Sequence, residues 1–168
     1  MERKSLLQSF AIDKDGRVRA VSEVARGLAC ECRCPACSEA VVARQGEVRG
    51  WHFAHVSGAE CVAAGESALH LAAKQLLMDT RGFTVPEMRA TFDTRLPSGQ
   101  VSRGLAVEPG GWIDFDSVQK EVEYGGLRPD LLSTTGGRLL MVEIAVTHFV
   151  GPEKIDQIET LGVAALEI

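Results

Sequence analysis

The sequence lacks a long apolar segment. None of its hydrophobic runs approaches the roughly 20 residues that a helix needs to cross a bilayer, although 45% of the 168 residues are hydrophobic. The first residues, MERKSLLQSFAIDKDG, carry charge but neither an apolar core nor a cleavage pattern. We therefore expect no signal peptide, no membrane contact and a cytoplasmic location.

An excess of positive charge is also lacking. The net charge is −5, which argues against a protein that coats nucleic acid without selectivity. Residues 1–60 hold nine Lys and Arg against eight Asp and Glu, whereas residues 61–168 hold nine against fifteen. A bound divalent cation would offset part of this second imbalance, and a small basic patch could still contact phosphates.

Cysteine is absent outside residues 30–61, and all five cysteines lie within that range. In a cytosolic protein such clustering indicates metal ligation more than disulfide bonds. Cys34-Pro-Ala-Cys37 is a CxxC turn, and two strand-like segments, 40–44 and 48–53, follow it. Zinc takes four ligands in a tetrahedron, and a CxxC turn supplies two of them.

The second pair of zinc ligands comes from His52, His55 and Cys61. We favour His55 and Cys61, since both lie beyond the second strand and can form the opposing loop; His52 is the alternative. Cys30 and Cys32 have a less suitable spacing. The competing interpretation is that these residues are buried thiols and core histidines. Residues 1–62 are thus predicted to form a β-hairpin around Lys14-Asp15-Gly16 and a zinc-ribbon-like module.

The strongest predicted helix covers residues 63–80, AAGESALHLAAKQLLMDT, and Arg81-Gly82 ends it. Leu69, Ala73 and Leu76 fall on one apolar stripe of this helix, and Ala72 and Leu77 widen it. Because such a stripe normally faces the core of a protein, we expect these residues to be buried.

A second stripe of the same helix is polar. Glu66, His70 and Lys74 recur at every fourth position and therefore share one face. The simpler interpretation is a solvent-exposed ladder of charges. In the alternative interpretation, Glu66 reaches a metal ion and Lys74 or His70 contacts a phosphate.

Two strand-like segments, 127–133 and 138–147, flank a turn that contains Gly136-Gly137. Each segment carries one carboxylate, Asp130 or Glu143, so the two side chains can converge. Glu143 lies in an apolar run, where a carboxylate is costly to bury unless a cation accompanies it. Two converging carboxylates suit Mg²⁺ or Mn²⁺.

Other charged residues near the hairpin leave alternatives open. Glu143 could instead form an ordinary ion pair with Arg128 or Arg138. Residues 117–124 read as a preceding strand, on which Glu123 could extend the acidic cluster. After the hairpin, the sequence predicts a helix that begins at Pro152 and ends at Gly162. A buried strand is predicted to follow it over residues 163–168. The apolar face of this helix comprises Ile155, Ile158 and Leu161.

The predicted order from residue 63 is helix, strands, helix and strand, which resembles the PD-(D/E)XK restriction-endonuclease-like core, an α/β fold with a mixed central sheet. More closely, the chain resembles the competence-protein CoiA-like nuclease family, in which a CxxC…HFxH…C segment precedes an ESxxHxxxK helix and a nuclease core. The matching segments are Cys34-Pro-Ala-Cys37, His52-Phe-Ala-His55, Cys61, Glu66-Ser-Ala-Leu-His70 with Lys74, Arg128-Pro129-Asp130 and Glu143-Ile-Ala-Val-Thr147-His148.

The resemblance implies a Mg²⁺- or Mn²⁺-dependent nuclease that acts on DNA, as an endo- or an exonuclease, with residues 63–168 as the nuclease domain. Asp130 and Glu143 would hold the catalytic metal, with Glu66 or Glu123 completing its ligands. The zinc bound by the N-terminal module would be structural.

The superfamily places a lysine two residues after the glutamate, where this chain has Ala145. Lys154 and Lys74 are the candidates to replace that lysine. Because of Ala145, a catalytically inactive DNA-binding or processing partner that retains the nuclease fold is the alternative function. A third interpretation is a zinc-stabilised protein-interaction module. Homo-oligomers and protein partners are left open.

Overall fold

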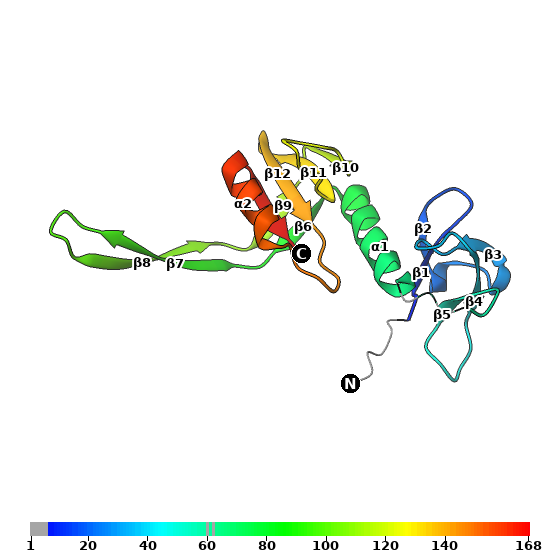
Figure 1. Cartoon of the computed structure of the whole chain (residues 1–168). Coiled ribbons are helices and arrows are strands. Elements are labelled where there is room, and N and C mark those ends of the chain that lie inside the picture. The colour runs from blue at the N-terminus through cyan, green and yellow to red at the C-terminus, as the bar shows by residue number, and fades with distance from the viewer. Residues whose placement is uncertain (1–6, 60, 62) are drawn as a thin grey trace.

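The computed structural model describes residues 7–59, 61 and 63–168, and shows a mixed α/β fold, mostly strands with two α-helices. Five strands form an N-terminal sheet in the order β2-β1-β3-β4-β5 (Figure 1). Their bounds are β1 Phe10–Ile12, β2 Val18–Ala20, β3 Gly27–Arg33, β4 Ala40–Arg44 and β5 His52–His55. The predicted hairpin is confirmed, since β1 pairs antiparallel with β2. The hairpin and the strands that carry the Cys/His residues belong to one sheet.

The predicted strand 48–53 is wrong, because β5 begins only at His52. The chain between β4 and β5 forms a loop, and Gln45 is the first residue of this loop. The Gln45 side-chain amide donates hydrogen bonds to the backbone carbonyls of Val21 and Val24. These contacts fix the loop against the short 3₁₀-helix η1, Val21–Glu23.

Helix α1, Ala64–Thr80, is confirmed, and Arg81 ends it in a left-handed conformation, with its N–H donating to Leu77 O. The prediction for its apolar stripe is wrong for Leu69 and Leu76, which are 42% and 61% exposed. It is confirmed for Leu77, which the helix buries together with Ala68. Leu77 packs into the core that the C-terminal sheet forms. Contact with this core therefore decides which side of the helix is buried, although Leu69 and Leu76 are larger apolar residues than Ala68.

The C-terminal sheet has the strand order β10-β11-β12-β13 (Figure 1). Strands β10, β11 and β12 pair antiparallel, and β13 pairs parallel with β12 after the crossover helix α2. Gly136 and Gly137 form the β11–β12 turn with φ of +53° and +73°, the two positive values that a tight hairpin turn requires. The bounds are β10 Ser117–Lys120, β11 Leu131–Thr135, β12 Arg138–Glu143, α2 Pro152–Leu161 and β13 Ala164–Glu167.

Several predicted boundaries in this sheet are wrong. The hairpin strands begin at Leu131 rather than 127 and end at Glu143 rather than 147. Strand β10 ends before Glu121, whose φ of +54° is incompatible with a continuing strand. The expected burial of the last strand is also wrong, because β13 lies at the sheet edge and is largely exposed.

The segment between α1 and β10 contains the four strands β6 to β9. Strand β6, Gly82–Val85, pairs with β9, Gly111–Asp114. Between them, β7, Met88–Arg95, and β8, Val101–Glu108, form a long hairpin that projects from the body (Figure 1). We call residues 88–108 the arm. None of the described helices is long and apolar enough to cross a membrane.

Candidate metal centre and carboxylate–lysine site

Four side chains converge where the N-terminal sheet meets α1. Cys34 follows β3, Cys37 lies in the next turn, His55 ends β5 and Cys61 precedes α1. The ligand atoms of these four residues all lie within 4.8 Å of one another, and Cys37 Sγ lies 3.2 Å from His55 Nε2. Three sulfurs and one imidazole nitrogen are a typical zinc ligand set. These residues could hold a metal ion, which agrees with the predicted structural zinc.

The CxxC turn is shaped by its own backbone. Cys34 N–H donates to Glu39 O at 2.8 Å, and Ser38 N–H donates to Cys34 O at 2.9 Å. Burial raises the pKa of the Cys34 thiol, and hydrogen bonds from the N–H groups of Ala36 and Cys37 lower it in part. Since the same N–H groups would stabilise a thiolate, the turn fits a metal ligand at Cys34.

The alternative ligands lie elsewhere. His52 is buried, and its Nδ1 lies 2.8 Å from Gly50 O. Cys30 and Cys32 belong to the apolar core of the N-terminal sheet. Cys37, in contrast, is exposed, which disagrees with the interpretation of these cysteines as core thiols alone.

A second cluster of charged groups lies at the end of the β11–β12 hairpin. Leu131 pairs with Val142, so the next residue on each side, Asp130 and Glu143, face each other across the two chains. Glu143 is 8% exposed. The predicted convergence of the two carboxylates follows from this register, because neighbouring strands place opposite residues side by side.

Helix α1 supplies two partners for Asp130. Lys74 Nζ lies 2.8 Å from Asp130 Oδ1, and His70 Nε2 lies 2.8 Å from Oδ2. The backbone N–H of Ile144 donates to the same Oδ2 at 2.9 Å. Lys74 is 5% exposed and also pairs with Glu121 at 2.9 Å. The interpretation of this helix face as a solvent-exposed ladder is therefore wrong.

Helix α2 supplies the partner for Glu143. Lys154 Nζ lies 2.7 Å from Glu143 Oε1, so neither Arg128 nor Arg138 is the ion-pair partner that the sequence suggested. Despite this ion pair, Oε1 is buried without a hydrogen bond of standard geometry to any described residue. A buried carboxylate oxygen with spare bonding capacity suits a hard cation.

The charges of the cluster shift one another's pKa values. Burial alone would raise the pKa of Asp130, but hydrogen bonds from Lys74, His70 and Ile144 outweigh it and lower this pKa. For Glu143, burial dominates over the Lys154 ion pair, and its pKa is raised. Burial acts to lower the pKa of Lys74, yet its pKa is raised, because Asp130 and Glu121 both favour the charged ammonium. The two carboxylates thus differ in their affinity for a proton.

Glu66 lies on the same helix face but has other partners. Its carboxylate accepts a hydrogen bond from Thr147 and lies 3.6 Å from His148 Nδ1. Thr147 follows the end of β12 rather than lying on the strand. Among the described residues, the only group of three or more ligand atoms within 4.8 Å is the Cys/His cluster, so Glu66 does not join Asp130 and Glu143 in a tight acidic cluster.

Glu123 was predicted to extend the acidic cluster, and the structure instead brings in Glu121. Glu123 is exposed beyond the end of β10. Glu121 contacts both Lys74 and Arg128. In a regular strand over residues 117–124, Glu121 and Glu123 would share one face, but the φ of +54° at Glu121 ends the strand before either residue.

One family matches the chain: the model described as competence protein CoiA, N-terminal domain, matches residues 22–64. No curated protein and no solved structure matches the chain. The matched residues contain β3, β4 and β5 with all four members of the Cys/His cluster. They do not include the carboxylate–lysine site. The match supports a relationship to CoiA-like proteins: residues 22–64 are similar to a CoiA N-terminal domain, and in this chain they contain the Cys/His cluster that could hold a metal ion.

Proposed function

We propose that this chain is a metal-dependent nuclease that hydrolyses phosphodiester bonds in DNA. The observation that carries the proposal is the placement of Asp130 and Glu143 next to the Leu131–Val142 pair of β11 and β12, with one lysine within 2.8 Å of each carboxylate. The resemblance to CoiA-like nucleases points to DNA as the substrate. The order of elements supports the same proposal, since α1, the antiparallel strands β10–β12, α2 and the parallel strand β13 follow one another as we expect for a PD-(D/E)XK core.

Asp130 and Glu143 would hold Mg²⁺ or Mn²⁺, which would act as a Lewis acid that polarises the phosphate and lowers the pKa of the attacking water. Glu143 Oε1 has Lys154 as its single partner and can also face a cation, whereas both oxygens of Asp130 are engaged by groups of α1. Binding through Asp130 Oδ1 would therefore displace the Lys74 ammonium from that oxygen. His70 and the Ile144 N–H would keep Oδ2, and hence the carboxylate plane, in place.

Lys154 takes the role that Ala145 cannot supply. Its ammonium approaches Glu143 from α2 rather than from the strand. There it can hold the attacking water or contact a phosphate oxygen and stabilise the negative charge that develops in the transition state. Glu66, held by Thr147 and His148, lies at the edge of the site, where it can orient a water bound to the cation.

Zinc at Cys34, Cys37, His55 and Cys61 would be structural. Four protein ligands close the coordination shell and leave no position for a substrate. The cluster links His55, at the end of β5, to Cys61, which lies just before α1. It would thereby fix α1, and with it His70 and Lys74, relative to the N-terminal sheet.

The test is a cleavage assay on single- and double-stranded DNA with Mg²⁺ or Mn²⁺, comparing the wild type with Asp130→Asn and Glu143→Gln. Each substitution keeps the shape of the side chain and removes its charge, and each is expected to lower the rate by about 10²-fold or more. Glu123→Gln is the matched control, because it removes an exposed carboxylate outside the cluster. Absence of cutting by folded, zinc-loaded wild type would refute the nuclease, as would full activity of either variant.

A catalytically inactive DNA-binding partner is the second candidate function. Two observations favour it: Ala145 stands at the usual lysine position, and both carboxylates already have ammonium partners. This candidate predicts DNA binding with a steep salt dependence and no cleavage with any divalent ion. Fluorescence anisotropy with labelled DNA, measured over a range of salt, separates it from the nuclease.

A further inference from the structure

Three carboxylates lie in a row at one end of β10, β11 and β12. Lys120, the last residue of β10, pairs with Leu131. The next residues, Glu121 and Asp130, are joined by a hydrogen bond from the Glu121 N–H to the Asp130 backbone carbonyl oxygen at 3.1 Å. The register of β11 and β12 places Glu143 on the other side of Asp130. Asp130 is therefore the middle carboxylate of the row.

One ammonium group serves two of these carboxylates. Lys74 Nζ lies 2.8 Å from Asp130 Oδ1 and 2.9 Å from Glu121 Oε1. The Lys74 side chain is only 6% exposed, whereas that of Glu121 is 45% exposed. An ammonium group in so buried a position needs a charged partner, because little water can reach it. Asp130 can therefore release this ammonium group at low cost only if another carboxylate keeps it.

The backbone holds Glu121 in place for this contact. Its φ of +54° lies in the left-handed region, which disfavours residues that carry a Cβ. Arg128 Nε donates a hydrogen bond to the Glu121 backbone carbonyl at 2.8 Å, and the guanidinium group lies 3.6 Å from Glu121 Oε2. Since glycine would adopt this backbone without strain, the glutamate found here points to a role for its carboxylate.

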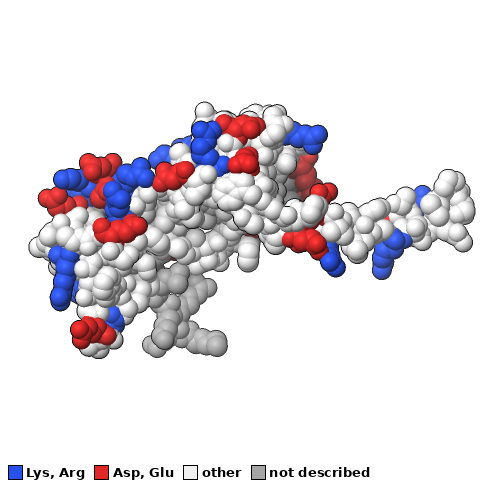
Figure 2. Space-filling view, turned by 180° about the vertical axis from the view of Figure 1, so that it is seen from behind, with Lys and Arg blue, Asp and Glu red and all other residues white. Residues whose placement is uncertain are grey.

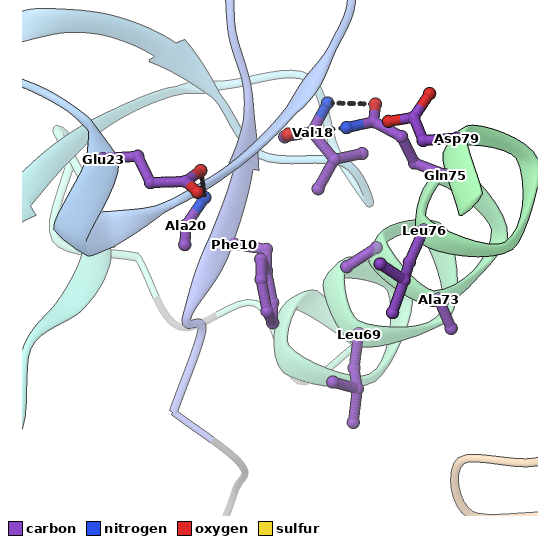
Figure 3. Close-up of a pocket in the computed structure, with 10 residues that line it drawn as sticks. Phe10, Val18, Ala20, Glu23, Leu69, Ala73, Gln75, Leu76 and Asp79 are labelled. Atoms are coloured by element: carbon purple, nitrogen blue, oxygen red, sulfur yellow. Dashed lines mark hydrogen bonds between the residues drawn. The ribbon is translucent and has the colours of Figure 1, made fainter. Parts of the chain in front are cut away.

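The backbone of α1 beside Lys74 is fixed, but the Lys74 side chain has room to move. The next residue, Gln75, exchanges two hydrogen bonds with the backbone of Val18 in β2, at 2.9 and 3.0 Å, and Figure 3 shows one of them. Lys74 and Glu121 line a cavity of about 310 Å³ between the β1–β2 hairpin, α1 and the end of β10. A change in the partners of Lys74 therefore requires only a rotation of its side chain.

We propose that Glu121 is a positioning residue that keeps the Lys74 ammonium group when Asp130 Oδ1 exchanges this group for a divalent cation. The inference rests on the proposed function, in which Asp130 holds Mg²⁺ or Mn²⁺. Without the Glu121 carboxylate, Asp130 would be the only charged partner of Lys74 among the described residues. The ammonium group would then compete more strongly with the cation for Asp130.

The first test is the affinity of the full-length, zinc-loaded protein for Mn²⁺, measured by isothermal titration calorimetry. We expect Glu121→Gln to weaken binding about tenfold, because a carboxamide holds an ammonium group less strongly than a carboxylate does. Glu123→Gln is the matched control, since it removes the same charge from an exposed residue outside the Lys74 ion pairs. Figure 2 shows acidic and basic side chains intermixed over the body of the molecule, so we expect this control to bind Mn²⁺ as the wild type does.

Removing Lys74 separates positioning from a general effect of charge. In the Lys74→Met background no ammonium group competes for Asp130, so the addition of Glu121→Gln should change the Mn²⁺ affinity by less than about twofold. An equally large loss in this background would overturn the proposal, because Glu121 would then act on the cation through its charge alone. Equal Mn²⁺ affinities of the wild type and Glu121→Gln would also overturn it.

The ammonium group can also be followed with Lys74 in place. A buried ammonium group held by carboxylates is protected from exchange with water and gives a proton–nitrogen NMR correlation. We expect the Lys74 correlation to persist in the wild type at saturating Mg²⁺ and to be lost in Glu121→Gln. Its loss in the Mg²⁺-bound wild type would overturn the inference alone, whereas a wild type that binds neither Mg²⁺ nor Mn²⁺ would overturn the metal site of the proposed function as well.

Discussion

Lys154 Nζ lies 2.7 Å from Glu143 Oε1, and this contact places an ammonium group beside the second carboxylate of the site although the strand itself has Ala145. The lysine reaches the site because α2 crosses over between the parallel strands β12 and β13. In this fold the position of a lysine in space is thus separable from its position in a strand motif.

Replacing Lys154 should separate catalysis from folding. We expect Lys154→Met to lower the cleavage rate by about 10²-fold or more, because a positioned ammonium group would no longer stabilise the developing charge. Lys14→Met, at an exposed lysine in the N-terminal turn, is the control and should cleave normally. Steady-state cleavage rates with circular dichroism of both variants make the comparison. Normal cleavage by Lys154→Met would remove Lys154 from the mechanism.

Lys74 should contribute strongly to stability. Its buried ammonium compensates Asp130 and Glu121, so Lys74→Met leaves Asp130 buried without its main counter-charge and should destabilise the protein by about 3 kcal/mol or more. The double variant Lys74→Met, Asp130→Asn should recover part of this loss, since it removes the uncompensated charge. Urea unfolding of the single and double variants measures both values. Equal stabilities of the two variants would contradict the ion pair.

Zinc content should depend on four residues only. We expect Cys37→Ser and His55→Ala each to abolish stoichiometric zinc, measured by mass spectrometry of metals, because each removes one of four converging ligands. His52→Ala and Cys32→Ala remove buried residues outside the cluster and should retain it. Loss of zinc in His52→Ala with retention in His55→Ala would reverse the choice of histidine.

Cys32 should be unreactive in the folded protein. Burial, together with its contact to Cys30, raises the pKa of the Cys32 thiol to about 12, and the residue is only 2% exposed. Iodoacetamide at pH 8 should therefore modify Cys32 only after unfolding, as peptide mass spectrometry would show. Modification of Cys32 at the rate of an unfolded thiol would contradict its place in the core.

Asp13 should confer stability that depends on pH. The Arg19 side chain donates a hydrogen bond to Asp13 at 2.8 Å and is the main cause that lowers the pKa of this carboxyl below 3.8. A lowered folded-state pKa stabilises the protein above the unfolded value, and the effect disappears as pH falls through the folded value. The Tm difference between wild type and Asp13→Asn should thus shrink from about pH 7 to about pH 3. Asp15→Asn is the control, and a difference that grows in acid would give the opposite sign.

The sequence alone determined the elements whose ends have a local physical cause. Arg81-Gly82 ended α1, Pro152 and Gly162 bounded α2, and the paired glycines fixed the β11–β12 turn. The CxxC turn and the spacing of His55 and Cys61 were also sufficient to select the ligand set that converges in space. Backbone preferences and short loops constrain these features, so little information from the rest of the chain is needed.

Tertiary structure decided which faces are buried and which charges meet. Periodicity placed Leu69 and Lys74 on different faces of α1, but only the position of the C-terminal sheet buried the lysine and exposed the leucine. The contact between Lys154 and Glu143 depends on the β12–α2–β13 crossover. Burial and ion pairing depend on surfaces contributed by distant segments, and their energies are set only when those segments pack together.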